Sequence, residues 1–402
     1  MKIGLIKEGK IPPDRRVPFT PEQLKYLSQK YQGQIEFVVQ SSDIRCFSDQ
    51  EFVEAGVEVR KDVSDCDCLM GIKEVPISQL IPNKTYVFFS HTIKKQDHNR
   101  KLLQAILEKN IRLMDYEVLK DNDGQRTVAF GRWAGIVGAY NGLWTYGKKS
   151  GLFDLKRAKD CHDRTELNQE LKKVQLPPIK IVVTGSGRVG KGALEILHEI
   201  NIKEVNPHDF IHHYYDEPVF TVLRTGDYNR RKTDGGYDRE EFFSHPEKYE
   251  SHFLKFAEVS DLFIAAAYWD QRAPRLFELE DIRLEDFNIS VIADITCDID
   301  GSVPTTRKAS SIADPVYDVD RESLELIPAF GKQNSISVMA IDNLPTELPR
   351  NASEEFGEQL MENFLPELLK ENSQILDKAT IAQEGDLTLE FMYLRDYVEQ
   401  KD

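Results

Sequence analysis

The 402-residue sequence has few cysteines and lacks any long apolar run. Its five cysteines are odd in number and scattered, which argues against a disulfide framework and predicts a cytoplasmic protein. The first residues, MKIGLIKEGKIPPDRR, contain no long apolar core, so a secretory signal peptide is not expected. No segment approaches the roughly 18 apolar residues of a membrane span, so the sequence predicts no membrane partner.

The sequence also lacks cysteine and histidine spacings typical of metal sites, and it has fewer basic than acidic residues. Cys66 and Cys68 are separated by one residue, which is not a zinc spacing, and no Cys/His pair completes a site, so no metal is expected. The chain has 52 Lys and Arg against 68 Asp and Glu, a formal net charge of −16. Nucleic acid is therefore not expected as a partner, because phosphate binding needs a basic face. An anionic small molecule would have to be bound by a few local cations.

Strand-like and helix-like segments alternate in the N-terminal third. Apolar runs predict strands at 2–6, 35–39, 68–72, 86–89 and 112–116. Helices are predicted after Thr20, over 50–56 and over 97–109, and Thr20, Pro21 and Gln23 fit a helix start with a capping box. Strands that alternate with helices predict a parallel sheet with helices on its faces.

A second α/β segment follows residues 150–178, which are polar and indicate a helical spacer and linker. Further buried strands are predicted at 180–183, 219–223, 261–267 and 290–296. Residues 225–252 are rich in charge, Gly and Tyr and indicate surface excursions. A long amphipathic helix is expected over 353–370, interrupted by Pro366.

The stretch GSGRVG, residues 185–190, fits the GxGxxG pattern of dinucleotide binding. An apolar strand precedes it and a helix follows it, as the motif requires. Gly185 permits the tight turn, Gly187 lets the backbone approach a pyrophosphate, and Gly190 allows close helix packing. A glycine-rich turn without a ligand is the alternative. The context favours a bound dinucleotide.

The end of the next strand bears on which dinucleotide is bound. An NAD enzyme should place an acidic residue there to hold the ribose 2′-hydroxyl. The strand 219–223 ends instead at Arg224, with Arg230 and Arg231 close behind, which favours the 2′-phosphate of NADP(H). NAD(H) held by Asp216 or Asp227, or a solvated basic loop, are the alternatives.

Four cations follow predicted strand ends in the N-terminal segment. They are Arg16, Lys73, His91 and Arg126. Each alone is more often a surface charge or a structural histidine, but ligands bind at the carboxyl ends of strands in open α/β folds. Arginines match carboxylates, a buried lysine beside another cation can act as a base, and histidine can carry a proton. These are the groups that hydride transfer to an imine requires.

The residues also resemble a known family. The stretches that carry the likeness are RRVPFTP, KTYVFFSHTIK, IRLMDYE, VAFGRWAGIVG, RKTDGGYD, AYWDQRAPRL, ADITCDIDGS and MAIDNLPTELP. They cover nearly the whole chain, and a weaker likeness continues to YLRDYVE. The chain is similar to the alanine dehydrogenase/saccharopine dehydrogenase superfamily, and within it to the lysine–2-oxoglutarate reductase domain of the bifunctional aminoadipic semialdehyde synthase.

The resemblance implies an α/β fold with two Rossmann-like parallel-sheet domains around a central cleft. A substrate domain would comprise residues 1–140 plus 345–402, and a dinucleotide-binding domain residues 141–344. The implied reaction joins lysine and 2-oxoglutarate through an imine that NAD(P)H reduces to saccharopine. NADP(H) is favoured as the cofactor, and NAD(H) is the alternative. A separate saccharopine-oxidising enzyme is expected in the pathway.

The resemblance also assigns residues. Lys73 matches the family's general base and His91 its general acid. Implied substrate contacts are Arg16, Lys73, Arg126, Phe130, Thr296, Cys297 and Asp298. Implied cofactor contacts are Gln96, Gly187, Arg188, Tyr268, Ile295, Ile341, Asp342, Asn343 and Leu344. The related fungal pattern has an arginine where this chain has Gln125.

Two other functions remain open on the sequence. One is another amino-acid dehydrogenase of the superfamily, such as an alanine dehydrogenase acting on a small oxo acid. The other is a nucleotide-sensing protein that retained the fold without catalysis. The presence of Lys73 and His91 weighs against the second alternative.

Overall fold

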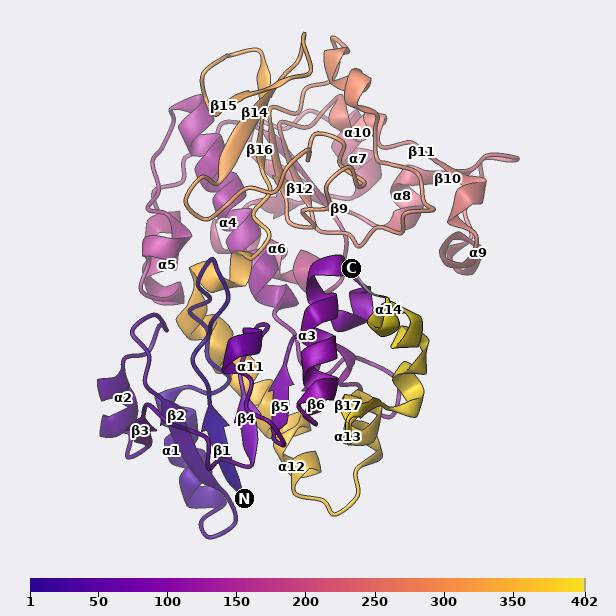
Figure 1. Cartoon of the computed structure of the whole chain (residues 1–402). Coiled ribbons are helices and arrows are strands. Elements are labelled where there is room, and N and C mark those ends of the chain that lie inside the picture. Colours follow the sequence, from indigo (N-terminus) through magenta and orange to yellow (C-terminus); the bar gives the residue numbers. More distant parts are fainter. Residues whose placement is uncertain (401–402) are drawn as a thin grey trace. The chain divides into compact units, whose positions relative to one another are not determined.

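The computed structural model describes residues 1–400 and divides into two compact units, each with its own sheet (Figure 1). Unit 1 contains Met1–Phe130 together with the residues from Pro349 onward, and unit 2 contains Gly131–Leu348. The predicted domain boundary at residue 140 falls inside the helix α4 (Gly131–Ser150), which lies wholly in unit 2. Within residues 1–400, no helix combines the length and the apolar character needed to cross a membrane.

Unit 1 is built on an eight-stranded sheet in the order β18-β17-β6-β5-β4-β1-β2-β3. The strands β1 to β6 are parallel, as predicted, whereas β17 pairs antiparallel with β6 and with β18. The sequence predicted no strand at either of these two positions. The strands are β1 (Lys2–Leu5), β2 (Glu36–Gln40), β3 (Glu58–Arg60), β4 (Cys68–Met70), β5 (Thr85–Phe88), β6 (Arg112–Asp115), β17 (Thr380–Gln383) and β18 (Asp386–Leu387).

Helices cover both faces of the unit 1 sheet, because side chains alternate along each strand. Phe37 and Met70 belong to the apolar core on one face, and their neighbours Val38 and Leu69 to the core on the other. The first face packs against α1 (Pro21–Lys30), α2 (Asp49–Glu54), α11 (Pro349–Asn363), α12 (Leu365–Leu368) and α13 (Gln374–Ala379). The second packs against α3 (Asp97–Glu108), η8 (Leu389–Leu394) and α14 (Arg395–Glu399). The remaining 3₁₀ turns are η1 (Ile77–Gln79), η2 (Thr92–Lys94) and η3 (Tyr116–Val118).

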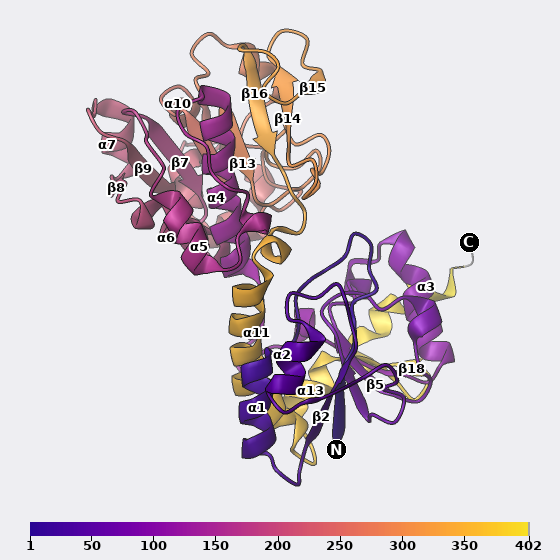
Figure 2. The same cartoon turned by 90° about the vertical axis from the view of Figure 1, so that its left-hand side faces the viewer.

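Local sequence signals explain where these helices begin and end. The capping box of Thr20 and Gln23 is present at the start of α1, as predicted. The side chain of Gln23 also donates to the carbonyl of Glu354, so α1 lies beside α11 (Figure 2). The predicted long helix is divided into α11 and α12 at Phe364, directly before Leu365 and Pro366.

Unit 2 contains a second eight-stranded sheet, in the order β15-β14-β16-β13-β12-β7-β9-β8. Six strands are parallel, while β14 runs antiparallel to both β15 and β16. The strands are β7 (Lys180–Thr184), β8 (Lys203–Glu204), β9 (Val219–Leu223), β12 (Leu262–Ala265), β13 (Val291–Asp294), β14 (Val316–Asp320), β15 (Leu326–Pro328) and β16 (Ser335–Met339). The helices besides α4 are α5 (Arg164–Leu171), α6 (Arg188–Glu199), α7 (Pro207–His212) and α10 (Leu254–Ala257), with 3₁₀ turns η4 (Ala158–Asp160), η6 (Leu279–Arg283) and η7 (Leu344–Glu347).

Two segments of unit 2 are more ordered than the sequence predicted. The expected spacer contains α5, which buries Leu167 and Leu171, so it is part of unit 2 and not a linker. The expected excursion folds into α8 (Thr225–Tyr228), β10 (Asn229–Arg231), α9 (Arg239–Ser244), η5 (Pro246–Lys248) and β11 (Tyr249–Ser251). It buries Phe242 and Tyr249, so its aromatic residues form a small core.

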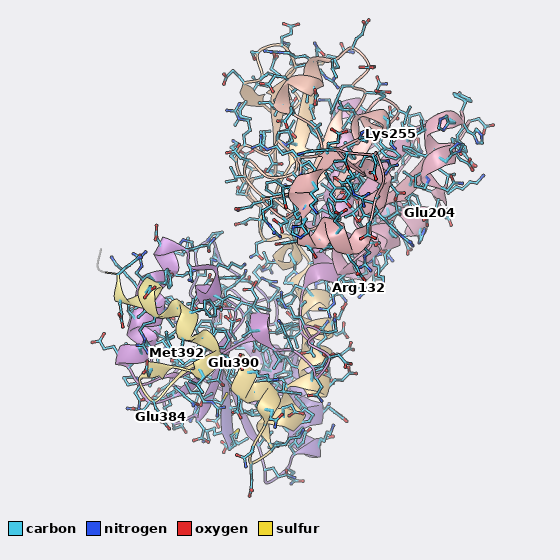
Figure 3. All side chains as sticks on the ribbon, turned by 90° about the vertical axis from the view of Figure 1, so that its right-hand side faces the viewer. Arg132, Glu204, Lys255, Glu384, Glu390 and Met392 are labelled. Atoms are coloured by element: carbon cyan, nitrogen blue, oxygen red, sulfur yellow. The ribbon has the colours of Figure 1, made fainter. Side chains whose placement is uncertain are left out.

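Helices α4 and α6 approach each other through glycines. A Cβ on Gly135 would lie 1.9 Å from the carbonyl oxygen of Val189, and one on Gly192 would lie 2.0 Å from that of Arg132. Arg132, labelled in Figure 3, also donates from Nε to Glu195 at 2.6 Å. Only residues without a side chain permit this backbone contact, so the glycines determine the spacing of the two helices.

We expect Gly135→Ala to lower the melting temperature by several degrees, because the added methyl group overlaps the backbone of α6. Such overpacking costs about 1–3 kcal/mol. Gly131→Ala is the matched control, since its Cβ would come no closer than 3.4 Å to Arg188 and 3.5 Å to the side chain of Val189, which is ordinary van der Waals contact. Thermal unfolding measures both variants, and equal melting temperatures would contradict the proposed steric limit.

Candidate functional site

The four predicted cations of unit 1 emerge at one edge of its sheet. Arg16 follows β1, Lys73 follows β4, His91 follows β5 and Arg126 follows β6. These strands are parallel neighbours, so the loops after them meet at the carboxyl edge. The structure therefore brings together the cations that the sequence singled out.

Lys73 has a lowered pKa. Burial and the positive charges of Arg16 and Lys10 lower the pKa of its ammonium to about 8, although Asp14 and Glu74 act in the opposite direction. Within residues 1–400, no hydrogen bond or ion pair engages the Lys73 ammonium. A lysine with such a pKa is partly neutral near pH 7, so it can accept a proton.

Glu8 holds the backbone at Lys73. Its carboxylate accepts from the N–H groups of Ile72 at 2.6 Å and Lys73 at 2.9 Å. Burial, together with the charge of Asp14, raises the pKa of Glu8 to about 8. These two hydrogen bonds connect the loop after β1 to the end of β4.

His91 is held by a neighbouring carboxylate. Its Nδ1 lies 2.5 Å from Oε1 of Glu74, whose other oxygen pairs with Lys10 at 2.9 Å. Burial alone would raise the pKa of Glu74, but the hydrogen bond and charge of His91, with Lys10, lower it to about 2. Glu74 is therefore an anion at neutral pH. It orients the imidazole and leaves Nε2 to exchange a proton.

The backbone before His91 is also fixed. Asp115 accepts from both the N–H and the hydroxyl of Ser90, at 2.9 and 2.5 Å. His91 itself adopts a φ of 53°, which is uncommon for a residue with a side chain. Its ring stacks on Phe89 at 6.4 Å between centroids. The surrounding contacts thus maintain an unusual backbone conformation at a functional candidate.

Arg16 is buried and paired on two sides. Its guanidinium donates to both oxygens of Asp14, at 3.0 and 2.5 Å, and lies 4.1 Å from the ring centroid of Phe130. Phe130 in turn stacks on Phe356 of α11 at 4.4 Å. Arg126 lies 5.3 Å from the ring of Phe89. The implied substrate contacts Arg16, Arg126 and Phe130 therefore share one aromatic surface.

Gln96 is exposed at the start of α3, where its carbonyl accepts from Tyr397 at 2.5 Å. Lys94, next to the histidine turn, pairs with Glu117 at 3.4 Å.

The predicted dinucleotide loop of unit 2 has the expected strand–turn–helix form between β7 and α6. Gly185 has a φ of +95°, and a Cβ there would lie 2.7 Å from the carbonyl of Ala266. A Cβ on Gly190 would lie 2.0 Å from the carbonyl of Gly185, so the close contact is with the turn itself. Nothing lies within 4 Å of a Cβ on Gly187, the N-cap of α6, before Arg188. The open space at a helix N-terminus fits a pyrophosphate.

Arg224 follows β9 as predicted, and β9 is the parallel neighbour of β7. Its side chain is exposed, whereas Arg230 donates to the carbonyls of Gly226 and Asn229, and Arg231 donates to Asp234 and Glu241. Asp227 accepts from the Arg224 N–H at 2.6 Å. Asp216 precedes β9 and is therefore at the opposite edge of the sheet, which excludes it from the nucleotide loop.

The remaining implied contacts also follow parallel strands of unit 2. Tyr268 follows β12 and is 88% exposed. Ile295, Thr296, Cys297 and Asp298 follow β13, and Ile341, Asp342, Asn343 and Leu344 follow β16. Ile295, Ile341 and Leu344 are buried, so any contact of theirs with a ligand has to come from the backbone.

The turn after β13 is organised by the buried Asp294. Its carboxylate accepts from the hydroxyls of Thr296 and Thr306, both at 2.6 Å, and from the N–H of Cys297 at 3.3 Å. Cys297 has a φ of 54°, and its thiol donates to the carbonyl of Ala340 at 2.8 Å. Burial, with Asp294 nearby, raises the pKa of this thiol to about 12, so it is not a ready nucleophile.

Sequence reasoning missed the carboxylates of these sites. Glu8, Asp14, Glu74 and Asp294 all orient a candidate residue or its backbone. The signal for Glu74 was its position next to Lys73 in GIKEVP, and for Asp14 its position in the PDRR turn. Within residues 1–400, no group of three or more His, Cys, Asp or Glu side chains could hold a metal ion.

Two family models match this chain, one in each half of the sequence. Residues 4–137 match the alanine dehydrogenase/PNT N-terminal domain, and residues 167–390 match the alanine dehydrogenase/PNT C-terminal domain. The mitochondrial alpha-aminoadipic semialdehyde synthase of Mus musculus is 31% identical, over 97% of this chain and 47% of that protein. The chain thus spans about half the length of this relative.

A shorter relative and a solved structure extend the comparison. Saccharopine dehydrogenase [NAD(+), L-lysine-forming] of Yarrowia lipolytica is 28% identical, over 91% of this chain and 92% of that protein. A solved L-alanine dehydrogenase aligns with a TM-score of 0.66 at 16% identity, covering 99% of this chain and 100% of its own. This structural likeness shows the α/β fold alone.

We expect competitive acetylation of Lys73 to reach half its maximum near pH 8, because only the neutral amine reacts and its pKa is lowered to about 8. An ordinary lysine has a pKa of about 10.4. Asp14→Asn should move the midpoint to lower pH, since the Asp14 charge raises the pKa of Lys73. Mass spectrometry of the labelled peptide measures both. A midpoint near that of an ordinary lysine would refute the assigned environment.

Proposed function

This chain belongs to the alanine dehydrogenase/PNT family, and from that premise we propose that it forms or cleaves saccharopine with a nicotinamide cofactor. In the forming direction, L-lysine, 2-oxoglutarate and NAD(P)H give saccharopine, NAD(P)⁺ and water. The names of the relatives support this reaction. The observation that supports this reaction most directly is the half-buried Lys73, whose pKa is about 8 and whose neighbour in the chain, Glu74, holds the imidazole of His91.

The residues of unit 1 suit the proton transfers of this reaction. Neutral Lys73 takes a proton from the ε-ammonium of the substrate lysine, so that the amine can attack the ketone of 2-oxoglutarate. His91 gives a proton to the oxygen that leaves as water, as the C–O bond breaks and the C=N bond forms. A bound reduced nicotinamide supplies the hydride that converts the protonated imine to a secondary amine.

The arginines suit the substrate carboxylates. Lysine and 2-oxoglutarate carry three carboxylates between them, and a guanidinium binds a carboxylate with parallel hydrogen bonds. Arg16 and Arg126 lie on the aromatic surface of Phe130 and Phe89, which restricts their side chains. We assign these two arginines to orientation of the oxo acid or the lysine backbone.

Lys73→Met should lower kcat by roughly 10²–10⁴-fold, because it removes the proton acceptor. For the unmodified protein, kcat/KM should rise with pH through about 8 as Lys73 becomes neutral. Cofactor absorbance, with lysine and 2-oxoglutarate, measures both. Lys25→Met, on the exposed side of α1, is the matched control and should retain activity.

The same assay separates the competing functions. Turnover of pyruvate and ammonia in preference to lysine and 2-oxoglutarate would replace the proposal with an alanine dehydrogenase activity. Cofactor binding without turnover of any amine and oxo-acid pair would indicate a nucleotide-sensing protein.

The preferred cofactor is part of the proposal. NADP(H) is supported by the exposed Arg224 at the end of β9, which suits a 2′-phosphate. NAD(H) is the alternative, with Asp227 as the acceptor for the ribose hydroxyls. The fungal relative is named for NAD(+), whereas the Asp227 carboxylate of this chain already accepts from a backbone N–H.

Arg224→Ala should lower the ratio of kcat/KM for NADPH over NADH by roughly tenfold or more, because a charge-assisted hydrogen bond contributes about 1.5–3 kcal/mol. The matched control is Arg283→Ala, an exposed arginine that donates to the carbonyl of Glu322. Initial-rate kinetics with both cofactors gives the ratio, and a ratio unchanged by Arg224→Ala would favour NAD(H).

We place the enzyme in the cytoplasm, together with a separate enzyme that oxidises saccharopine. The five free thiols are consistent with a reducing compartment. Cell fractionation tests the location, and saccharopine consumption in an extract depleted of this chain tests for the second enzyme.

A further inference from the structure

Three histidines lie in the stretch PHDFIHH, residues 207–213, which contains the short helix α7 of unit 2. His208 and His212 are four residues apart, so they lie on the same face of the helix. Their rings stack, with centroids 4.4 Å apart and planes 26° from parallel. The side chain of His208 is 76% exposed, and His212 is also exposed. The pair therefore presents two imidazoles to solvent at the spacing with which a helix binds zinc.

The hydrogen bonds of the two rings determine which nitrogens are available to a ligand. Nδ1 of His212 lies 2.8 Å from the carbonyl oxygen of His208, and Nδ1 of His208 lies 3.4 Å from Oδ1 of Asp209. Both oxygens are acceptors, so in the neutral rings each Nδ1 carries the proton and each Nε2 keeps a lone pair. Within residues 1–400, neither Nε2 has a hydrogen-bond or ion-pair partner. Histidines that bind metals share this arrangement, in which the other ring nitrogen donates to a carbonyl or a carboxylate.

The backbone that carries the pair is held at both ends of the helix. The side chain of Asn206 accepts from the N–H of Asp209 at 2.9 Å, as the N-cap of α7. At the other end, the ammonium of Lys180 in β7 donates to the carbonyls of Phe210 at 2.5 Å and His213 at 2.8 Å. Phe210 is fully buried in the core of unit 2. The helix is therefore formed without a ligand, and little conformational freedom is lost on binding.

The separation of the two rings suits a shared metal ion. Zinc bonds an imidazole nitrogen at about 2.0–2.1 Å, so two ligand nitrogens are about 4.2 Å apart at most. The centroid separation of 4.4 Å is close to that limit, and exposed side chains have the freedom to turn by the small angle required. Two protein ligands leave the other positions of a tetrahedral ion to water. Such an open site is consistent with the absence, among the described residues, of any group of three or more metal-binding side chains.

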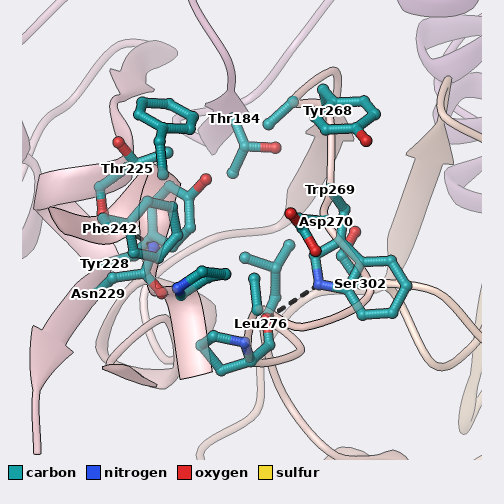
Figure 4. A pocket seen from close by; sticks show the side chains of 15 residues that line it. Thr184, Thr225, Tyr228, Asn229, Phe242, Tyr268, Trp269, Asp270, Leu276 and Ser302 are labelled. Carbon is teal, nitrogen blue, oxygen red and sulfur yellow. Dashed lines mark hydrogen bonds between the residues drawn. The ribbon is translucent and has the colours of Figure 1, made fainter. Parts of the chain in front are cut away.

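The histidine pair is remote from the nucleotide turn. Helix α7 leads into the amino end of β9, and Figure 2 shows it beside β8 and β9. Figure 4 shows a pocket at the carboxyl end of β9, which Thr225 and Tyr228 line. The residues that line this pocket all lie outside α7. A ligand of the histidine pair is therefore independent of the proposed function.

We propose that His208 and His212 form a solvent-open site for one divalent transition-metal ion of the class of zinc, copper and nickel. These ions accept imidazole ligands, whereas Mg²⁺ and Ca²⁺ require oxygen ligands. The ion binds both Nε2 atoms and links two consecutive turns of α7. The carbonyl of His208 and the carboxylate of Asp209 hold the rings in the tautomer that binds it. The cysteine spacings of the sequence predicted no metal, because they do not include this pair.

Calorimetric titration of the whole chain with ZnCl₂ tests the site. His208→Ala and His212→Ala should each raise the Kd for Zn²⁺ roughly tenfold or more, because a single imidazole does not chelate the ion. His213→Ala is the matched control, since it removes an adjacent imidazole that is 59% exposed and faces Asp209 at 3.8 Å. This control should leave the Kd for Zn²⁺ unchanged.

Thermal unfolding separates loss of a ligand from loss of the fold. Without metal, the unmodified protein and the three variants should have equal melting temperatures, because the substituted rings are exposed. A saturating concentration of Zn²⁺ should raise the melting temperature of the unmodified protein by a few degrees and leave that of His212→Ala unchanged. The same concentration of MgCl₂ should raise neither.

Four results would overturn the proposal. The first is no Zn²⁺ binding by the unmodified protein, and the second is a Kd for Zn²⁺ that only one or neither of His208→Ala and His212→Ala raises. The third is equal weakening by His213→Ala, which would contradict the choice of ligands. The fourth is displacement of Zn²⁺ by an equal concentration of Mg²⁺, which would indicate an oxygen site elsewhere.

Discussion

The candidate sites depend on one recurring interaction, in which a buried carboxylate accepts from backbone N–H groups where a parallel strand ends. Hydrogen bonds of the sheet stop there, and the chain must turn away with its amides satisfied. Glu8 accepts from backbone N–H groups after β4, Asp115 from one after β5 and Asp294 from one after β13. In each case the next residues are the functional candidates Lys73, His91 and Cys297. The carboxylates therefore fix the backbone from which these side chains project.

The same edge of the sheet explains how an acidic chain can present cations to an anionic ligand. The net charge is −16, yet Asp14 and Glu74 at this edge are engaged with Arg16 and His91. Their negative charges therefore hold the side chains of Arg16 and His91 in place. Lys73 is the exception, since burial and neighbouring cations lower its pKa to about 8 while its ammonium has no ion-pair partner in the part of the chain that the structure describes. Because the Lys73 ammonium has no ion-pair partner among the described residues, its pKa stays low enough for the amine to accept a proton.

The sequence predicted the parts of the fold whose signals are local. The capping box of α1, the strand before GSGRVG and the strand that ends at Arg224 are confirmed, because each depends on residues a few positions apart. The strands β17 and β18 were missed, since they are four and two residues long and are stabilised by pairing with the distant β6. Glu8 was missed for the same reason, as its partners at Ile72 and Lys73 lie 64 and 65 residues away. The aromatic core of residues 225–252 was hidden by the high content of charge and glycine around it.

The assignment of β17 and β18 to the first sheet has a consequence for biosynthesis. Unit 2 is one continuous stretch, so its residues have all been translated when the ribosome has passed Leu348. Unit 1 begins earlier but is complete only after β17 and β18 have been made. Domains of nascent chains usually fold in order from the N-terminus; here the second unit can fold first. Until then the edge of β6 is without its neighbour, and an unpaired strand edge promotes aggregation. During translation, unit 1 would therefore depend on chaperones more than unit 2, although unit 1 is the first to be synthesised.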